Sequence, residues 1–250
     1  RYRPSALTRQ MLAGKKVGRK VGEGFYKYVD GQKTNEAAPQ VVPEVTEFSP
    51  IWIKADRETD ESILRDYIRE QGLVIDAAET PAAQSLILLA TYGEDTTTAA
   101  LRFGVDASRA VSIDMLTDFA KRRTLMPSIA TEKTYIDQAH ALFAKQGHGV
   151  SVIAESIGFV AQRVLAMVAN LACDIAQQQI ATAADIDKAV KLGLGYPHGP
   201  ISWGDVLGAD RILLILERIL ANTGDQRYRP SPWLKRRAQL NLSLLHTASV

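Results

Sequence analysis

Hydrophobic positions alternate between strand-like and helix-like patterns over residues 50–156. Short apolar runs predict buried strands, and apolar residues three or four positions apart predict helices between them. The strongest run, residues 85–90, is typical of a strand that is buried on both faces of a parallel sheet. This alternation favours an open α/β sheet. Its strands are predicted at residues 51–54, 73–75, 85–90, 110–113 and 150–153, and its helices at 58–71, 96–103 and 131–146.

From residue 157 onward the pattern is that of helices alone. Apolar positions at helical spacing follow one face over several turns, and glycines separate the segments. Residues 157–250 are therefore predicted to form an all-α domain, with helices at 158–179, 182–192, 211–222 and 232–240.

The first 49 residues carry little of either pattern. Residues 1–28 are typical of the tail of a domain, with a short helix that ends near Gly14 and a basic, glycine-rich stretch after it. A phosphate-binding loop would follow a buried strand and open a helix, whereas residues 25–28 are predicted to be extended. Residues 29–49 are predicted to be a linker, because polar, alanine- and proline-rich sequence follows an Asp-Gly turn.

The composition of the 250 residues is that of a globular protein, with 46% hydrophobic and 23% charged residues. A net charge of +2 gives no reason to expect nucleic acid or an anionic membrane as a partner. No apolar run is long enough to span a bilayer, and no signal-peptide pattern is present. The single cysteine, Cys173, and four scattered histidines predict no metal site. We therefore expect a cytoplasmic protein.

A pentapeptide, Arg-Tyr-Arg-Pro-Ser, occurs at residues 1–5 and again at residues 227–231. A chance match is the alternative to an internal duplication, and a repeat has to be considered before the fold is assigned. The duplication is the stronger interpretation, because this order of residues is not low-complexity sequence. It predicts that the chain is the C-terminal part of a longer protein.

The helical region resembles the C-terminal domain of the 3-hydroxyacyl-CoA dehydrogenases. The residues that carry the resemblance are Gly-Phe-Val-Ala-Gln-Arg at 158–163, Asp-Ile-Asp-Lys-Ala at 185–189, Leu-Gly-Leu-Gly-Tyr-Pro-His-Gly-Pro at 192–200, and Gly-Asp-Gln-Arg-Tyr-Arg-Pro at 224–230. The glycines and prolines of the third stretch fix a tight turn that few folds need. Residues 18–26, Gly-Arg-Lys-Val-Gly-Glu-Gly-Phe-Tyr, are similar to the sequence that closes the same domain.

The resemblance implies an α/β plus all-α fold with parts of two helical domains. Residues 1–28 are expected to end a first helical domain, and residues 157–250 to form a second. Residues 50–156 then stand where a parallel-sheet Rossmann domain precedes the helices. The first strand of this domain runs into Lys-Ala-Asp-Arg-Glu at 54–58, without the glycines that let a pyrophosphate approach the backbone. We therefore expect a degenerate Rossmann-like domain that binds no cofactor.

The family's catalytic positions are also changed. In the family a His after a sheet strand is the acid–base group, and a Glu farther along orients it. Asp114 and Met126 stand at these positions here, and Gln162 stands at the position of a family Asn. The resemblance thus predicts that this chain has no catalytic residue of its own.

The longer protein is expected to be an NAD-dependent dehydrogenase that oxidises 3-hydroxyacyl-CoA to 3-oxoacyl-CoA in fatty-acid β-oxidation or aromatic-acid degradation. Acyl-CoA and the missing N-terminal half are its expected partners, and the helical domain is a candidate homodimer interface. The chain alone is expected to be inactive, with a structural or interface role.

Two other functions remain open. The chain could be a non-catalytic acyl-CoA-binding or assembly module, or a different α/β enzyme that uses Glu94, Asp95 or Asp114. The loop after the central strand is the leading candidate pocket, because open α/β sheets bind ligands there. The candidate substrate contacts are Tyr92, Glu94, Ser156 and Tyr196.

Overall fold

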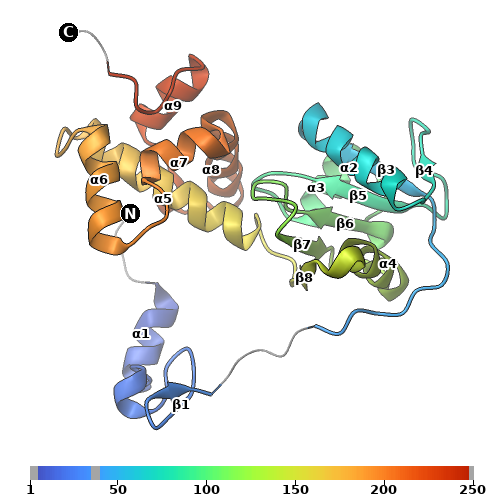
Figure 1. Cartoon of the computed structure of the whole chain (residues 1–250), viewed down its shortest axis with the longest axis horizontal. Coiled ribbons are helices and arrows are strands. Elements are labelled where there is room, and N and C mark those ends of the chain that lie inside the picture. The colour runs from blue at the N-terminus through green and yellow to red at the C-terminus, as the bar shows by residue number, and fades with distance from the viewer. Residues whose placement is uncertain (1–4, 35–39, 248–250) are drawn as a thin grey trace. The chain divides into compact units, whose positions relative to one another are not determined.

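The structure, a computed structural model, describes residues 5–34 and 40–247 (Figure 1). The chain falls into two units, residues 1–41 and residues 42–250. The first four residues of the first pentapeptide, Arg1 to Pro4, lie outside the described residues.

The first unit begins with helix α1 (Ala6–Ala13). The Ser5 hydroxyl accepts a hydrogen bond from the Thr8 N–H at 3.2 Å, which satisfies one of the free donors of the first turn. The glycine-rich stretch then forms a short 3₁₀ helix (Arg19–Val21) inside tight backbone turns. Gly24 is required there, because a Cβ atom on it would lie 2.7 Å from the Cα of Gly18.

A β-hairpin follows within the same unit and changes the prediction of a linker over residues 29–49. Strands β1 (Tyr28–Val29) and β2 (Gln32–Lys33) pair antiparallel around Asp30 and Gly31. Both turn residues have positive φ, 51° and 74°, as a two-residue hairpin turn of type I′ requires. The Asp-Gly signal therefore closes a hairpin within the predicted linker.

The second unit contains a six-stranded sheet with the order β4-β3-β5-β6-β7-β8. All neighbouring strands are parallel except β6 and β7. The strands are β3 (Ile51–Ala55), β4 (Ile75–Asp76), β5 (Leu86–Ala90), β6 (Ala110–Ile113), β7 (Arg122–Pro127) and β8 (Gly149–Val152).

Strand β7 was not predicted, and it makes the sheet mixed where a purely parallel one was expected. Residues 114–121 connect β6 to β7 without a helix. A parallel crossover needs a dozen or more residues, so this short connection returns the chain antiparallel to β6. The register sets Ser112 opposite Met126 and Ile113 opposite Leu125.

Helices cover both faces of the sheet. Alternation along the strands sends Leu86 and Leu88 to one face, and Ile87 and Leu89 to the other. Helices α2 (Glu58–Glu70) and α4 (Lys133–Ala144) cover the first face, and α3 (Thr96–Phe103) covers the second. The predicted α/β layer architecture is confirmed.

The helical domain is built around α5 (Val160–Gln177). Against it pack α7 (Pro200–Leu207), α8 (Ala209–Thr223), α9 (Pro232–Gln239) and α6 (Ala183–Leu194). The sequence pattern missed α7, because this helix is short and contains Gly204. That glycine lets α7 approach α5, since a Cβ atom on it would lie 3.3 Å from the Ala169 Cβ.

The Gly-Tyr-Pro-His-Gly-Pro turn is explained by Asp187 on α6. Its carboxylate accepts hydrogen bonds from the N–H groups of Ile201 (2.7 Å) and Ser202 (2.9 Å), at the start of α7. A Cβ atom on Gly199 would lie 2.2 Å from the Asp187 Cγ, so only glycine fits there. The carboxylate takes the place of an N-cap side chain that α7 lacks.

The second pentapeptide fixes the start of α9 on the long helix. Asn170 of α5 is fully buried; its Oδ1 accepts from the Ser231 N–H at 2.7 Å, and its Nδ2 donates to the Arg229 carbonyl at 3.0 Å. The Ser231 hydroxyl then caps α9. Ser5 and Ser231 thus play the same part in the two copies, since each caps a helix of 8 residues.

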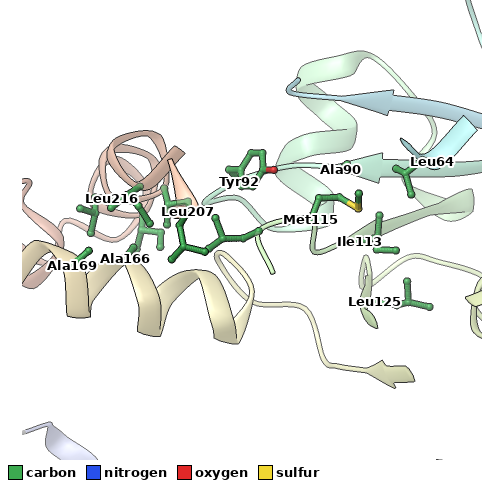
Figure 2. Close-up of a cluster of buried hydrophobic side chains, with 14 of the residues drawn as sticks. Leu64, Ala90, Tyr92, Ile113, Met115, Leu125, Ala166, Ala169, Leu207 and Leu216 are labelled. Carbon is green, nitrogen blue, oxygen red and sulfur yellow. The ribbon is translucent and has the colours of Figure 1, made fainter. Parts of the chain in front are cut away.

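One hydrophobic core runs from the sheet into the helical domain (Figure 2). It contains Ile113 and Leu125 of the sheet, Ala166 and Leu216 of the helices, and Tyr92 at the carboxyl end of β5. The predicted division between residues 50–156 and 157–250 therefore falls inside one unit. Among the described residues, no helix has the length and hydropathy needed to cross a bilayer.

Candidate functional site

The candidate site lies where the carboxyl ends of β3 and β5 meet. Strand β4 lies on one side of β3, and the next strand in the chain, β5, lies on the other side. The strand order therefore reverses between β3 and β5. Open α/β sheets bind ligands at such a switch point. Asp56 follows β3 there, and residues 92–94 follow β5.

Four charged side chains, Asp56, Glu94, Arg102 and Arg218, fill this switch point; we call them the ion-pair cluster. Arg218 of α8 donates to both carboxylate oxygens of Asp56, at 2.5 and 3.2 Å. Arg102 of α3 donates to Asp56 and to Glu94, at 2.8 Å each. The side chains of Asp56 and Glu94 are only 5% and 8% exposed. Both carboxylates therefore bind arginines and are not accessible to a ligand.

The turn after β3 does not fit a dinucleotide. It contains no glycine, and the side chain of Arg57 makes no hydrogen bond to the start of α2. The first turn of α2 carries Glu58, Asp60 and Glu61, which place negative charge where a pyrophosphate would need the positive end of the helix. The residues present therefore do not fit NAD, the cofactor that the fold implies.

Tyr92 and Asp95, beside this cluster, are also committed to internal contacts. The Tyr92 hydroxyl donates to Asp60 at 2.6 Å, and the side chain is fully buried. Burial, together with the hydrogen bond to Asp60, raises the pKa of Tyr92 above its ordinary value. Asp95 accepts from the Thr98 N–H at 2.7 Å and caps α3.

Asp114, the expected counterpart of the family's His, follows β6 and is almost completely buried. Its Oδ1 atom accepts from the Leu116 N–H and from the Gln162 amide, both at 3.0 Å. Burial raises the pKa of Asp114 above its ordinary value, although these two hydrogen bonds oppose the shift. The carboxyl group anchors the turn after β6 instead of facing an open site.

Gln162, the expected counterpart of a family Asn, joins the ends of two strands to α5. Its Oε1 accepts from the Gly93 N–H at 2.8 Å. Its Nε2 donates to the Thr91 carbonyl and to Asp114, both at 3.0 Å. The side chain is fully buried, so its amide is occupied by protein partners and not by a substrate.

Met126, the expected counterpart of the family's Glu, is fully buried on β7. Its sulfur accepts from the Ser156 N–H at 3.3 Å. A thioether is a weak acceptor without charge, so it cannot orient an acid–base group as a carboxylate does. The Ser156 hydroxyl in turn donates to the Gly158 carbonyl at 3.3 Å.

The structure places most, but not all, of the predicted site residues close together. Gln162 contacts Asp114 directly and reaches the loop of Tyr92 and Glu94 through Gly93. Tyr196 lies in the turn between α6 and α7, and among the described residues it shares no hydrogen bond with the other candidates. The candidate set is therefore one cluster at the sheet edge plus one separate turn residue.

Sequence reasoning missed Arg102 and Arg218. Arg218 meets Asp56 across 162 positions of the chain, and neither arginine stands in a motif. The one indication in the sequence was the turn at residues 54–58, whose acidic side chains place negative charge where a phosphate would bind.

A cavity of about 430 Å³ lies between the loop after β6 and the helical domain. Leu116 and Lys121 line it from the loop, and Leu165, His198 and Trp203 line it from the helices. No three His, Cys, Asp or Glu side chains within residues 5–34 and 40–247 are grouped so that they could hold a metal ion.

The family model of the 3-hydroxyacyl-CoA dehydrogenase C-terminal domain matches residues 158–244. These residues form a 3-hydroxyacyl-CoA dehydrogenase C-terminal domain. The match starts at the glycine before α5, which carries Gln162, and ends after α9. The predicted helical dehydrogenase domain is therefore confirmed.

The likeness to these dehydrogenases extends beyond the helical domain. A 3-hydroxyadipyl-CoA dehydrogenase from Escherichia coli is 30% identical over 240 residues, which are 96% of this chain and 45% of that protein. A probable 3-hydroxybutyryl-CoA dehydrogenase from Bacillus subtilis is 35% identical over 106 residues, or 42% of this chain and 37% of the relative. The chain spans less than half the length of both relatives.

The fold is also similar to that of a solved dehydrogenase structure. The crystal structure of a 3-hydroxybutyryl-CoA dehydrogenase from Escherichia coli matches with a TM-score of 0.71 and 28% identity, over 95% of this chain and 44% of that one. The likeness thus includes the sheet as well as the helices. The chain is therefore similar to 3-hydroxyacyl-CoA dehydrogenases over most of its own length.

Proposed function

We propose that this chain is a non-catalytic, structural part of an NAD-dependent 3-hydroxyacyl-CoA dehydrogenase. The ion-pair cluster carries the proposal, because two carboxylates and two arginines occupy the switch point at which a nucleotide would bind. Asp114, Met126 and Gln162 add support, since all three stand at family site positions and are buried in internal contacts.

The longer enzyme would contain two helical domains of the same kind. The repeated pentapeptide supports this part of the proposal, because Ser5 and Ser231 cap helices in the same way. The partial coverage of the Escherichia coli relative, 45%, is consistent with it. In this arrangement the residues that bind NAD and transfer the hydride belong to the other half of the enzyme.

We further propose the substrate, partners and location of that longer enzyme. It would oxidise 3-hydroxyacyl-CoA to 3-oxoacyl-CoA in the cytoplasm, with acyl-CoA and NAD bound by the half that precedes this sheet domain. The helical domain of residues 157–250 would serve as an interface, either with the other helical domain or with a second copy.

The test is turnover by the purified chain. NADH oxidation in the presence of acetoacetyl-CoA is followed by absorbance, beside an active 3-hydroxybutyryl-CoA dehydrogenase at equal concentration. We expect no turnover above the rate without protein. Turnover that scales with the concentration of this chain would contradict the proposal.

A second candidate function is an acyl-CoA-binding module, and the cavity beside Lys121 and Trp203 favours it. The cavity of about 430 Å³ falls within the size range of ligand pockets. Calorimetric titration with acetoacetyl-CoA, without NAD, separates the two functions. Binding by this chain supports the module, whereas no heat of binding supports the purely structural role.

A further inference from the structure

We propose that the carboxyl edge of this sheet is an interdomain clamp: the contacts at the switch point hold the sheet and the helical domain in one fixed arrangement. The inference does not depend on the activity of any longer enzyme. It rests on two sets of contacts, one from α8 and one from α5, that meet the ends of β3, β5 and β6.

Arg218 makes the first set. This α8 side chain donates to both oxygens of Asp56, to the Tyr92 carbonyl at 2.9 Å, and lies 3.3 Å from a carboxylate oxygen of Glu94. A guanidinium has a rigid fork of donors that a lysine cannot reproduce. A single α8 side chain thus binds the residues that follow two different strands.

The backbones are also in direct contact at this point. Gly93 has a φ of 70°, and a Cβ atom on it would lie 2.7 Å from the Ile215 carbonyl oxygen of α8. Gly158, which precedes α5, donates its N–H to the Glu94 carbonyl at 3.0 Å. Gly93 therefore brings the β5 loop against α8 with no space for a side chain, and Gly158 binds the same loop at the start of α5.

Gln162 makes the second set from α5. Its amide binds Thr91 and Gly93 after β5 and Asp114 after β6, as described above. The donors and acceptors of this set are buried, so water does not compete for them while the domains are together. Opening the two domains would break these hydrogen bonds and expose the apolar core that the sheet shares with the helices, which favours the closed arrangement.

Distances between spin labels on the two domains test the clamp. The labels are attached at L101C on α3 and L192C on α6, because these side chains are 74% and 78% exposed. The native Cys173 is fully buried, and burial raises the pKa of its thiol to about 12, so it does not react with the label. We expect one narrow distance distribution for the labelled chain, unchanged by NADH.

Variants of the two contact sets should then loosen the arrangement. In R218A/Q162A we expect loss of the single narrow distance and a broad distribution. R218K, which keeps the charge but not the fork, should give an intermediate width and guards against loss of folding in the double variant. E217Q is the matched control, since it removes an exposed ion pair between Glu217 and Lys235 within the helical domain and should leave the distribution unchanged.

Two results would overturn the clamp. One is a broad distribution in the labelled chain before any contact is removed. The other is a narrow distribution that stays the same in both R218K and the double variant, while circular dichroism shows that they are folded. Either result leaves the proposal of a non-catalytic chain untouched, because turnover is measured separately.

Discussion

Replacement of Gln162 by leucine is expected to destabilise the chain strongly. The substitution keeps the size of the side chain but removes its amide, which is fully buried and binds Gly93, Thr91 and Asp114. Each buried polar group left without its partner costs about 1–3 kcal/mol. For three such groups, with some relaxation of the neighbours, we expect a loss of about 3–5 kcal/mol in the free energy of unfolding.

Urea unfolding followed by far-UV circular dichroism measures this loss. Q177L is the matched control, because Gln177 lies at the other end of α5, is only half-buried and should change stability by less than about 0.5 kcal/mol. Q162N introduces the residue that is expected at this position in the family and is one methylene shorter than Gln, so the stability of this variant should fall between those of Q162L and Q177L. A loss below about 1 kcal/mol for Q162L would refute the view that this amide anchors both strands.

Three further predictions concern single buried groups. In D114N a neutral amide replaces a buried carboxyl group whose pKa is raised by burial. The free energy of unfolding of the variant, relative to the unchanged chain, should be constant below pH 3.8 and should increase as the pH rises above 3.8. Urea unfolding across pH checks this, and a difference that increases toward acid would contradict it. N170A removes the partner of two backbone groups, including the Ser231 N–H, and should cost about 2–4 kcal/mol in a thermal melt, whereas an unchanged melt would argue against the anchor. R123M should cost about 2–4 kcal/mol, because the buried guanidinium lies 4.4 Å from the ring centre of Tyr67 and donates to its hydroxyl; a more stable variant would show that its burial is itself the larger cost.

The sheet was predictable where strands are uniformly apolar. Residues 86–90 and 110–113 are strands, as their side chains indicate. Strand β7 was not, because its pattern contains Arg123, a charged residue that is buried among aromatic rings. A hydrophobicity pattern predicts that such a residue is exposed. Its burial is evident only from the tertiary structure around it.

The candidate site was predictable only in part. A resemblance to family motifs led to Asp114 and Gln162, and the structure brings these two side chains into a hydrogen bond at 3.0 Å. The resemblance gave no reason to single out Arg218, because ion pairs between distant segments leave no local signal in a sequence. The absence of glycines after the first strand was therefore visible in the sequence, while the ion pairs at this turn were not.

NADH binding by the purified chain tests the central claim most directly. Fluorescence of the nicotinamide is titrated with the chain, beside an active 3-hydroxybutyryl-CoA dehydrogenase as the positive control. The account predicts no saturable change at protein concentrations that saturate the control, because Asp56, Glu94, Arg102 and Arg218 occupy the switch point. Saturable binding that is lost on heat unfolding would contradict it.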